Sequence, residues 1–208
     1  MIELPTLKLE EELYEQSVKY VVGVDEAGRG PLAGDVYAAA VILPRNFDPK
    51  GINDSKKLTE KKREELFDYI TKNALSYGIG KATPQEIDKI NIRNAAFLAM
   101  RRAVEKIQTY IKSNSIHLLI DGNAFQGFGI PFTTITQGDS KSLSIAAASI
   151  LAKVSRDRAM RKLDKLHPEY GFAKHKGYPT KAHYAAIQNY GILPEHRKSF
   201  KLYKGIKE

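Results

Sequence analysis

The chain has 208 residues and no cysteine, which fits one domain with a small appendage and excludes disulfides, thiolate metal sites and cysteine nucleophiles. Lysine and arginine number 33 against 24 acidic residues, and this formal charge of +9 favours a polyanionic partner, although a basic surface also serves solubility. The apolar stretches are too short to span a bilayer and the N-terminus lacks a secretion signal, so we expect a soluble, cytoplasmic protein.

The first half of the chain predicts strands and helices around a glycine-rich break. Residues 1–16 predict a short peripheral helix, and the β-branched runs 19–25 and 35–43 predict an antiparallel strand pair across the break at 29–34. The elements expected next are a helix over 60–73 capped by Thr59, a strand over 77–82, a helix that starts with the capping box of 83–86, and a longer helix over 92–112. The helix predicted over 92–112 has one apolar stripe, formed by Phe97, Met100, Val104, Ile107 and Ile111.

The second half continues the same alternation. Residues 116–120 and 132–136 predict two more strands, and 142–163 predicts a helix whose alanines allow close packing. The segment from 167 onward is basic and aromatic. Since strands and helices interleave, the fold class is α/β, with a mixed central sheet flanked by helices.

Acidic residues occur where three of the predicted strands end. Asp25 and Glu26 close the first strand, Asp121 closes the fourth, and Asp139 follows the fifth. Strand ends are where α/β sheets gather catalytic groups. Each acid alone is more often structural, because Asp favours turns and helix caps. Neighbouring residues in a continuous strand also point to opposite faces, so Asp25 and Glu26 reach one site only if the strand ends or twists there.

Carboxylates gathered in one place repel one another, and a divalent cation removes that conflict. Oxygen ligands without nearby His or Cys suit Mg²⁺ or Mn²⁺. Two such ions can activate a water and stabilise the leaving oxygen in an in-line phosphoryl displacement. The acids therefore indicate metal-dependent phosphodiester chemistry.

Seven sequence blocks, in order, resemble ribonuclease HII, a type 2 ribonuclease H, over about residues 20–200. They are GVDEAGRGPLAG at 23–34, NDSKKL at 53–58, DGN at 121–123, GDS at 138–140, AASILAKV at 147–154 with Arg156 and Asp157, HKGYPT at 175–180, and HRKSF at 196–200. The resemblance implies an RNase H-like catalytic domain over 17–166, preceded by the peripheral segment 1–16 and followed by a small helical, basic extension over 167–208 that contacts substrate.

The same resemblance implies an endonuclease that hydrolyses the RNA strand of RNA–DNA hybrids. It also implies cleavage 5′ of single ribonucleotides embedded in duplex DNA, leaving 3′-hydroxyl and 5′-phosphate ends, and a place in ribonucleotide excision repair. By position, Asp25, Glu26, Asp121 and Asp139 correspond to the family's catalytic metal ligands, with Mg²⁺ or Mn²⁺ as cofactor. We expect the protein to act as a monomer on hybrid or ribonucleotide-containing duplex, without a membrane.

Five further residues correspond to substrate-binding positions of the family. Gly28, Arg29 and Gly30 match the segment that approaches the 2′-hydroxyl, Tyr178 the residue that packs on the sugar at the RNA–DNA junction, and Lys56 a phosphate contact. A plain tight turn needs the two glycines but not Arg29, and isolated tyrosines and lysines are usually core or surface residues. For His175 and His196 we expect backbone or phosphate contacts rather than a role as base.

Two other function classes fit part of the sequence. A catalytically silent duplex-binding module explains the charge, but acids beside a phosphate site weaken binding unless metal ions lie there. A two-carboxylate glycosidase explains the paired acids. The basic composition and the absence of tryptophan favour the nuclease.

Overall fold

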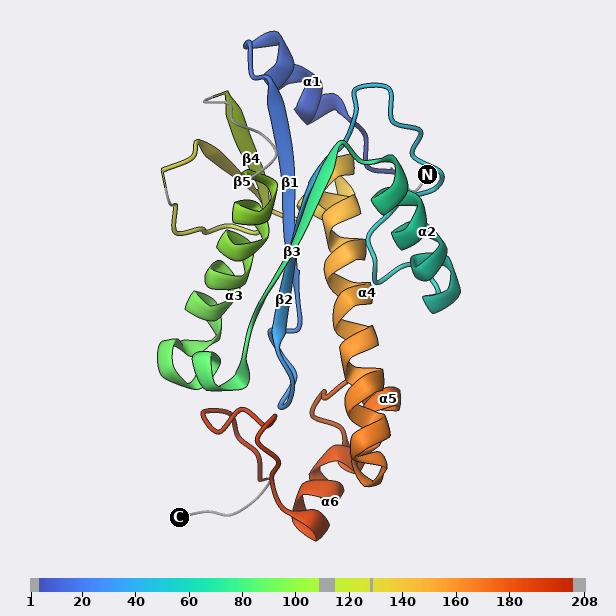
Figure 1. The fold of residues 1–208 in the computed structure, drawn as a ribbon, viewed down its shortest axis with the longest axis vertical. Helices are drawn as coiled ribbons and strands as arrows, with labels where there is room; N and C mark the ends of the chain where they lie inside the picture. The colour runs from blue at the N-terminus through green and yellow to red at the C-terminus, as the bar shows by residue number, and fades with distance from the viewer. Residues whose placement is uncertain (1–3, 109–114, 128, 204–208) are drawn as a thin grey trace.

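A computed structural model of the chain describes residues 4–108, 115–127 and 129–203, and its centre is one five-stranded sheet (Figure 1). The strands are β1 (Tyr20–Ala27), β2 (Val36–Ile42), β3 (Ser76–Ala82), β4 (Ile116–Asp121) and β5 (Phe132–Ile135). They lie in the order β3-β2-β1-β4-β5, with β1, β2 and β3 antiparallel and β1, β4 and β5 parallel. The predicted α/β class with a mixed sheet is confirmed.

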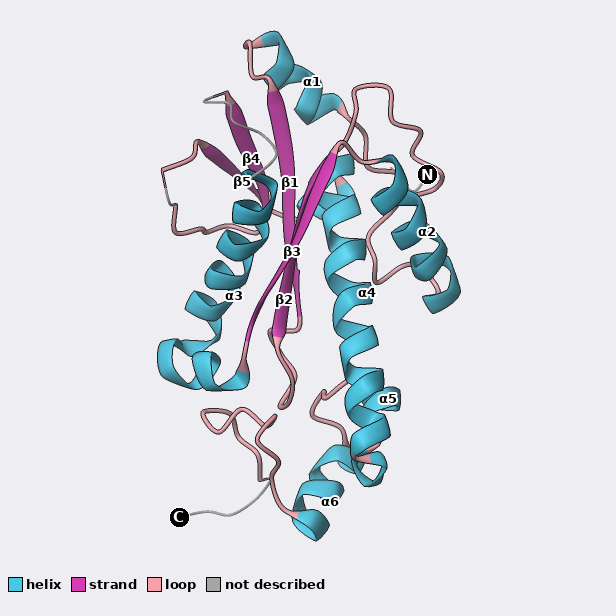
Figure 2. Cartoon of the chain, in the orientation of Figure 1, coloured by secondary structure: helices cyan, strands magenta, loops and turns pink. Residues whose placement is uncertain are grey.

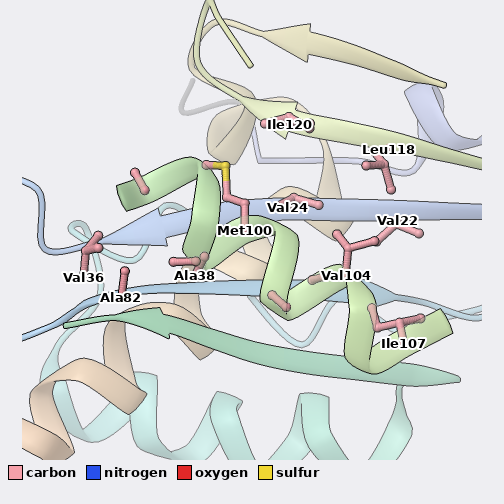
Figure 3. Packing of buried hydrophobic residues seen from close by; sticks show 14 of the residues in the cluster. Val22, Val24, Val36, Ala38, Ala82, Met100, Val104, Ile107, Leu118 and Ile120 are labelled. Carbon is pink, nitrogen blue, oxygen red and sulfur yellow. The ribbon is translucent and has the colours of Figure 1, made fainter. Parts of the chain in front are cut away.

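Helices cover both faces of this sheet (Figure 2). On one face lies α3 (Pro84–Gln108), which breaks at Asn91, where φ is 65°. The Asn91 side chain accepts a hydrogen bond from the Asn94 amide and restarts the helix, which explains why the sequence predicts two helical segments. The predicted stripe packs on the sheet (Figure 3), with Met100, Val104 and Ile107 buried there. Ile111 and the predicted helix end at 112 lie outside the described residues.

The other face is covered by α4 (Leu143–Leu166), which begins within a residue of its predicted start and continues three residues beyond its predicted end. Ser142 caps it, accepting a hydrogen bond from the Ile145 amide. At Gly23 the helix comes so close that an added Cβ would lie 2.1 Å from the Ser144 carbonyl carbon. Gly23 therefore lets the start of α4 lie directly against β1, and the alanines predicted to allow close packing in α4 are fully buried.

Two further helices pack around α4. The helix α1 (Lys8–Glu15) places the buried Glu10 at the start of α4, where one carboxylate oxygen accepts hydrogen bonds from the Ser142 hydroxyl and from the amide and hydroxyl of Ser144. The helix α2 (Glu60–Asn73) has the predicted Thr59 cap and pairs Glu64 with Arg158 of α4. The start of α4 and its C-terminal half are thus each joined to a segment distant in sequence.

The C-terminal part lies around the far end of α4 (Figure 1) and contains η2 (Pro168–Tyr170), α5 (Phe172–His175) and α6 (Lys181–Tyr190). It returns to the loop between β1 and β2, where the Leu32 amide donates to the Gly177 carbonyl and the Gly34 amide to the Glu195 carbonyl. Within the described residues, no helix is long and apolar enough to cross a membrane.

Candidate active site

Asp25 and Asp121 lie at corresponding positions on adjacent strands. Because β1 and β4 are parallel with Val24 opposite Ile120, the next residues on each strand are the two aspartates. Asp25 is buried, with 5% of its surface exposed, and its Oδ1 accepts a 2.6 Å hydrogen bond from the Glu26 amide. The Oδ1 atom of Asp121 accepts a 2.7 Å bond from the Gly138 amide. The sheet therefore unites two acids that are far apart in sequence.

Glu26 reaches the same region by a different route from the predicted one. β1 does not end at Asp25 but continues to Ala27, with Glu26 paired to Ala38 of β2, so the predicted strand end is wrong. It is β4 that ends, at Asp121, and so no β4 residue lies beside Glu26. Burial and the charge of Asp121 both raise the pKa of Glu26, while Arg29 opposes them. The influence of the Asp121 charge on Glu26 indicates that the two carboxylates lie near one another, at the point where β4 ends.

Asp139 lies in the short 3₁₀ turn η1 (Gly138–Ser140) after β5 and is 7% exposed. It is not a helix cap, because Ser142 caps α4. Gly138 packs closely against its neighbours, since an added Cβ would lie 2.6 Å from the Ile145 side chain and 3.3 Å from the Asp121 carboxylate. The bond from Gly138 to Asp121 therefore sets the position of Asp139, the next residue.

The acids share one electrostatic field. Burial raises the pKa of Asp25 well above its usual 3.8, and the charges of Glu26, Asp121 and Asp139 raise it further. Burial likewise raises the pKa of Asp139, together with the charges of Asp54 and Asp121. Mutual repulsion among these carboxylates lowers the stability of the folded state, and a bound cation would relieve it.

Lys56 is the basic residue beside this cluster. Its Nζ lies 3.9 Å from the Asp139 carboxylate, and its side chain is 80% exposed. Partial burial lowers its pKa, but the surrounding acids prevail and raise it. An exposed cation at the rim of an acidic site can contact a phosphate that enters the site.

The donor set fits a hard divalent cation. The four carboxylates supply only oxygen ligands, as Mg²⁺ and Mn²⁺ prefer. Among the residues that the structure describes, no three acidic or histidine side chains are gathered closely enough to coordinate an ion as they stand. Asp25 and Asp121 each use one oxygen for a backbone amide, which leaves the second oxygen of each for a ligand.

The loop between β1 and β2 carries the second group of predicted residues and is held by Arg197. This arginine is fully buried, and its guanidinium donates to the carbonyls of Gly28, Arg29, Pro31 and Gly34. Gly28 has φ +103°, and an added Cβ would lie 2.2 Å from Nε of the buried Arg156, so only glycine fits there. Arg29 projects outward, 56% exposed, 3.4 Å from Glu26.

Tyr178 lies against this loop. A Cβ added to Gly30 would lie 3.6 Å from its ring, and the Arg156 guanidinium lies 5.7 Å from the ring centroid on the inner side. The residue is 41% exposed. The glycine loop, Arg29 and Tyr178 therefore form one surface, which the contact between Arg29 and Glu26 joins to the acids.

The histidines make the expected backbone contacts. His175 contacts the Tyr170 carbonyl and the Gly177 amide, and His196 accepts from the Leu193 amide. Three residues with clear structural roles were given no role from the sequence: Asp54, which lies beside Asp139, and the buried Arg156 and Arg197. All three lie in the family blocks, but sequence alone does not distinguish a buried arginine from a surface one.

A central sheet of this strand order, with acidic residues near the ends of the adjacent strands β1 and β4, defines a hydrolase of the RNase H-like fold. The crystal structure of the ribonuclease H2 from Pyrococcus horikoshii OT3 has the same fold, with a TM-score of 0.71, 27% sequence identity, and coverage of 88% of this chain and 94% of that one.

Sequence comparison gives the family. The ribonuclease HII family model matches residues 22–203. Ribonuclease HII from Shewanella pealeana is 54% identical over 191 residues, covering 92% of both chains, and that from Clostridioides difficile strain 630 is 52% identical, covering 92% of this chain and 73% of the relative. The chain belongs to the ribonuclease HII family and is a hydrolase of the ribonuclease H type.

Proposed function

We propose that this protein cleaves the RNA strand of RNA–DNA hybrids and cuts on the 5′ side of single ribonucleotides in duplex DNA, leaving 3′-hydroxyl and 5′-phosphate ends. The observation that carries the proposal is the acidic cluster near the ends of β1 and β4, in which Asp25 and Asp139 are buried, and which is contiguous with the surface formed by Arg29 and Tyr178. A nuclease needs the cluster for phosphodiester hydrolysis and the surface to distinguish ribose from deoxyribose.

In this proposal Asp25, Glu26, Asp121 and Asp139 hold two divalent cations, Mg²⁺ or Mn²⁺. When bound, such ions supply activation of the attacking water and neutralisation of charge at the leaving oxygen. The protein supports this by holding the acids on the sheet and on the turn beside it, with backbone amides that orient Asp25 and Asp121. The raised pKa of Asp25 supports the assignment, because its repulsive surroundings favour a cation.

In the same proposal, the surface beside the four acids recognises the substrate. Gly28 and Gly30 leave backbone without a side chain next to the acids, so that the minor groove and its 2′-hydroxyl can come close. The Arg29 guanidinium, held near Glu26, is placed to bind the sugar–phosphate backbone. Tyr178 offers an exposed ring to the sugar beyond the ribonucleotide, and Lys56 contacts a phosphate.

The three-part organisation belongs to the same proposal. Residues 17–166 form the catalytic part and 1–16 support it, whereas 167–208 supply Tyr178 and the loop-binding Arg197. Contacts of Leu32 with Gly177 and of Gly34 with Glu195 support this joint use of the two larger parts. We also propose that the protein acts as a monomer, because one chain contains every residue named above.

The test uses an end-labelled DNA duplex with one ribonucleotide, incubated with Mg²⁺ or Mn²⁺ and mapped to single-nucleotide resolution. We expect a single cut 5′ of the ribonucleotide, abolished by chelation and absent from an all-DNA duplex of the same sequence. Cuts only within a continuous RNA–DNA hybrid would be consistent with the acidic centre as the site of hydrolysis. They would refute the proposed role of Arg29 and Tyr178 in recognising a single ribonucleotide. No cut in either substrate would refute the nuclease assignment.

A further inference from the structure

Beneath Tyr178 lies a group of three histidines that the proposed chemistry does not use. His183 and His196 are fully buried, and their Nε2 atoms are 3.1 Å apart. His175 stacks on His183 with ring centroids 4.5 Å apart. Phe172, itself fully buried, packs edge-on against His183. Buried histidines with specific partners require an account of where each proton lies.

The hydrogen bonds fix the tautomers of the central pair. The Leu193 amide donates to Nδ1 of His196 at 2.8 Å, so this nitrogen carries no hydrogen and Nε2 carries it. Nε2 of His196 therefore donates to Nε2 of His183, and the proton of His183 lies on Nδ1. That Nδ1 donates to the Tyr178 carbonyl at 3.1 Å. One directed chain of hydrogen bonds thus runs from Leu193 to Tyr178.

The two ends of this chain of hydrogen bonds lie at the two parts of the surface proposed to recognise ribose, which are Tyr178 and the 28–34 loop. At one end, the carbonyl of Tyr178 is held by His183, and its amide donates to the His175 carbonyl. At the other end, His196 forms a β-bridge with Ala33, in the loop that follows Gly28 and Gly30. The His183–His196 bond therefore links the segment that presents Tyr178 to the segment that supports the glycine loop.

We propose that His183 is a positioning residue that sets the separation between Tyr178 and the 28–34 loop, and with it the selectivity for an isolated ribonucleotide. The inference rests on the proposed function, which assigns ribose recognition to that surface. An isolated ribonucleotide offers one 2′-hydroxyl and one junction, so the tyrosine and the loop must bind both at a fixed spacing. A continuous RNA strand can bind in many registers, each with a 2′-hydroxyl near the loop, so its cleavage tolerates a less precise spacing between Tyr178 and the loop.

The test compares kcat/KM for a duplex with one ribonucleotide and for a continuous hybrid of the same sequence, in two variants. His183→Asn retains a donor near Nδ1 for Tyr178 but removes the acceptor for His196. His183→Gln places an amide near Nε2 but lacks the donor for Tyr178. We expect each to lower the single-ribonucleotide to continuous-hybrid ratio about tenfold. His117→Asn, which alters a histidine hydrogen-bonded to Thr133 at the β4–β5 pair, is the matched control and should leave the ratio unchanged.

A double variant distinguishes positioning from a general structural role. If His183 acts through Tyr178, the ratio for His183→Asn combined with Tyr178→Ala should be no lower than that for Tyr178→Ala alone. Equal losses on both substrates, an unchanged ratio in folded variants, or additive losses would overturn the proposal. If His183→Asn does not fold, the ratio measured for His183→Gln tests the proposal instead. If neither variant folds, the His183–His196 hydrogen bond serves stability alone and the proposal is overturned. The proposed function itself is tested separately, by whether the unaltered protein cuts 5′ of the ribonucleotide.

Discussion

Asp25 and Asp121 are neighbours across the only parallel pairing that β1 makes among the described strands, and each is oriented by a backbone amide. The bond to Asp121 comes from Gly138, so the same contact places Asp139. One parallel strand pair and the turn after β5 therefore bring three of the four acids together. This arrangement makes Asp121 the most informative position for mutation.

Asp121→Asn should abolish cleavage while leaving duplex binding intact. The amide keeps the size of the side chain and an acceptor for Gly138, but removes a charge needed to hold a cation, for a loss of about a thousandfold or more in kcat. Cleavage assays and binding titrations with the same labelled duplex check this. Turnover near that of the unaltered protein would refute the metal-site assignment.

Asp25→Asn should stabilise the metal-free protein at neutral pH. The folded-state pKa of Asp25 is raised, mainly by burial, so its stabilising contribution is complete below 3.8 and is lost as the pH rises through the raised value. Removing the charge should therefore increase the free energy of unfolding at pH 7 but not at pH 4.

Thermal unfolding with chelator present, from pH 4 to 8, measures this difference. The exposed Asp68→Asn on α2 is the control and should show little change. Added Mg²⁺ or Mn²⁺ should raise the melting temperature of the unaltered protein more than that of Asp25→Asn. A variant less stable than the unaltered protein at pH 7 would contradict the expectation.

Tyr178→Ala should lower cleavage at an isolated ribonucleotide more than cleavage of a continuous hybrid. The exposed ring lies over Gly30 and is proposed to pack on the sugar at the junction, a contact that continuous RNA needs less. Parallel kcat/KM measurements on the two substrates are the check. The control is Tyr190→Ala, which alters an exposed tyrosine at the end of α6 and should change cleavage of neither substrate. Equal losses on both substrates would contradict the junction role.

Arg197→Ala should destabilise the protein, because it leaves the carbonyls of the 28–34 loop buried without a donor. We expect a loss of about 4 kcal/mol in the free energy of unfolding, measured in urea. Arg197→Lys should restore little, since an ammonium cannot reproduce the fork of donors that reaches four carbonyls. The exposed Lys198→Ala is the neighbouring control. A Lys variant as stable as the unaltered protein would contradict this account.

Acid should weaken the fold partly through His183. Burial lowers its pKa from 6.5 to about 4, so its contribution to stability is present above 6.5 and is lost as the pH falls toward 4. The loss amounts to about 3 kcal/mol when complete. Urea unfolding at pH 7.5 and 4.5 should show a steeper decrease for the unaltered protein than for His183→Asn. Identical pH dependence in both proteins would exclude His183 as the titrating group.

The sequence predicted elements well where local chemistry determines them. Thr83 and Glu86 form the predicted capping box, each side chain bonding to the other's amide, and Thr59 caps α2. The strand that contains Asp25 was predicted to end too early. Its continuation to Ala27 depends on pairing with β2, a tertiary interaction that a strand's own residues do not encode.

The candidate site was predictable only in part, for a similar reason. The positions of the acids at predicted strand ends indicated the site, whereas the influence of Asp121 on Glu26 depends on the pairing of β1 with β4, which is a tertiary interaction. Arg197 occurs in a basic segment, where an arginine is expected at the surface, yet it is fully buried against carbonyls contributed by 28–34. The hydrogen-bond direction through His183 and His196 depends on their partners and could not be read from the residue types alone.

The bond from Arg197 to Gly28 joins residues at nearly opposite ends of the described chain. Its consequence concerns the order of events during synthesis on the ribosome. The segment that carries Glu26 and Gly28 emerges early, but its loop remains without a clamp until residue 197 has left the exit tunnel. The loop that contains Gly28 and Arg29 therefore reaches its final hydrogen-bonded arrangement only after the segment around residue 197 has been synthesised.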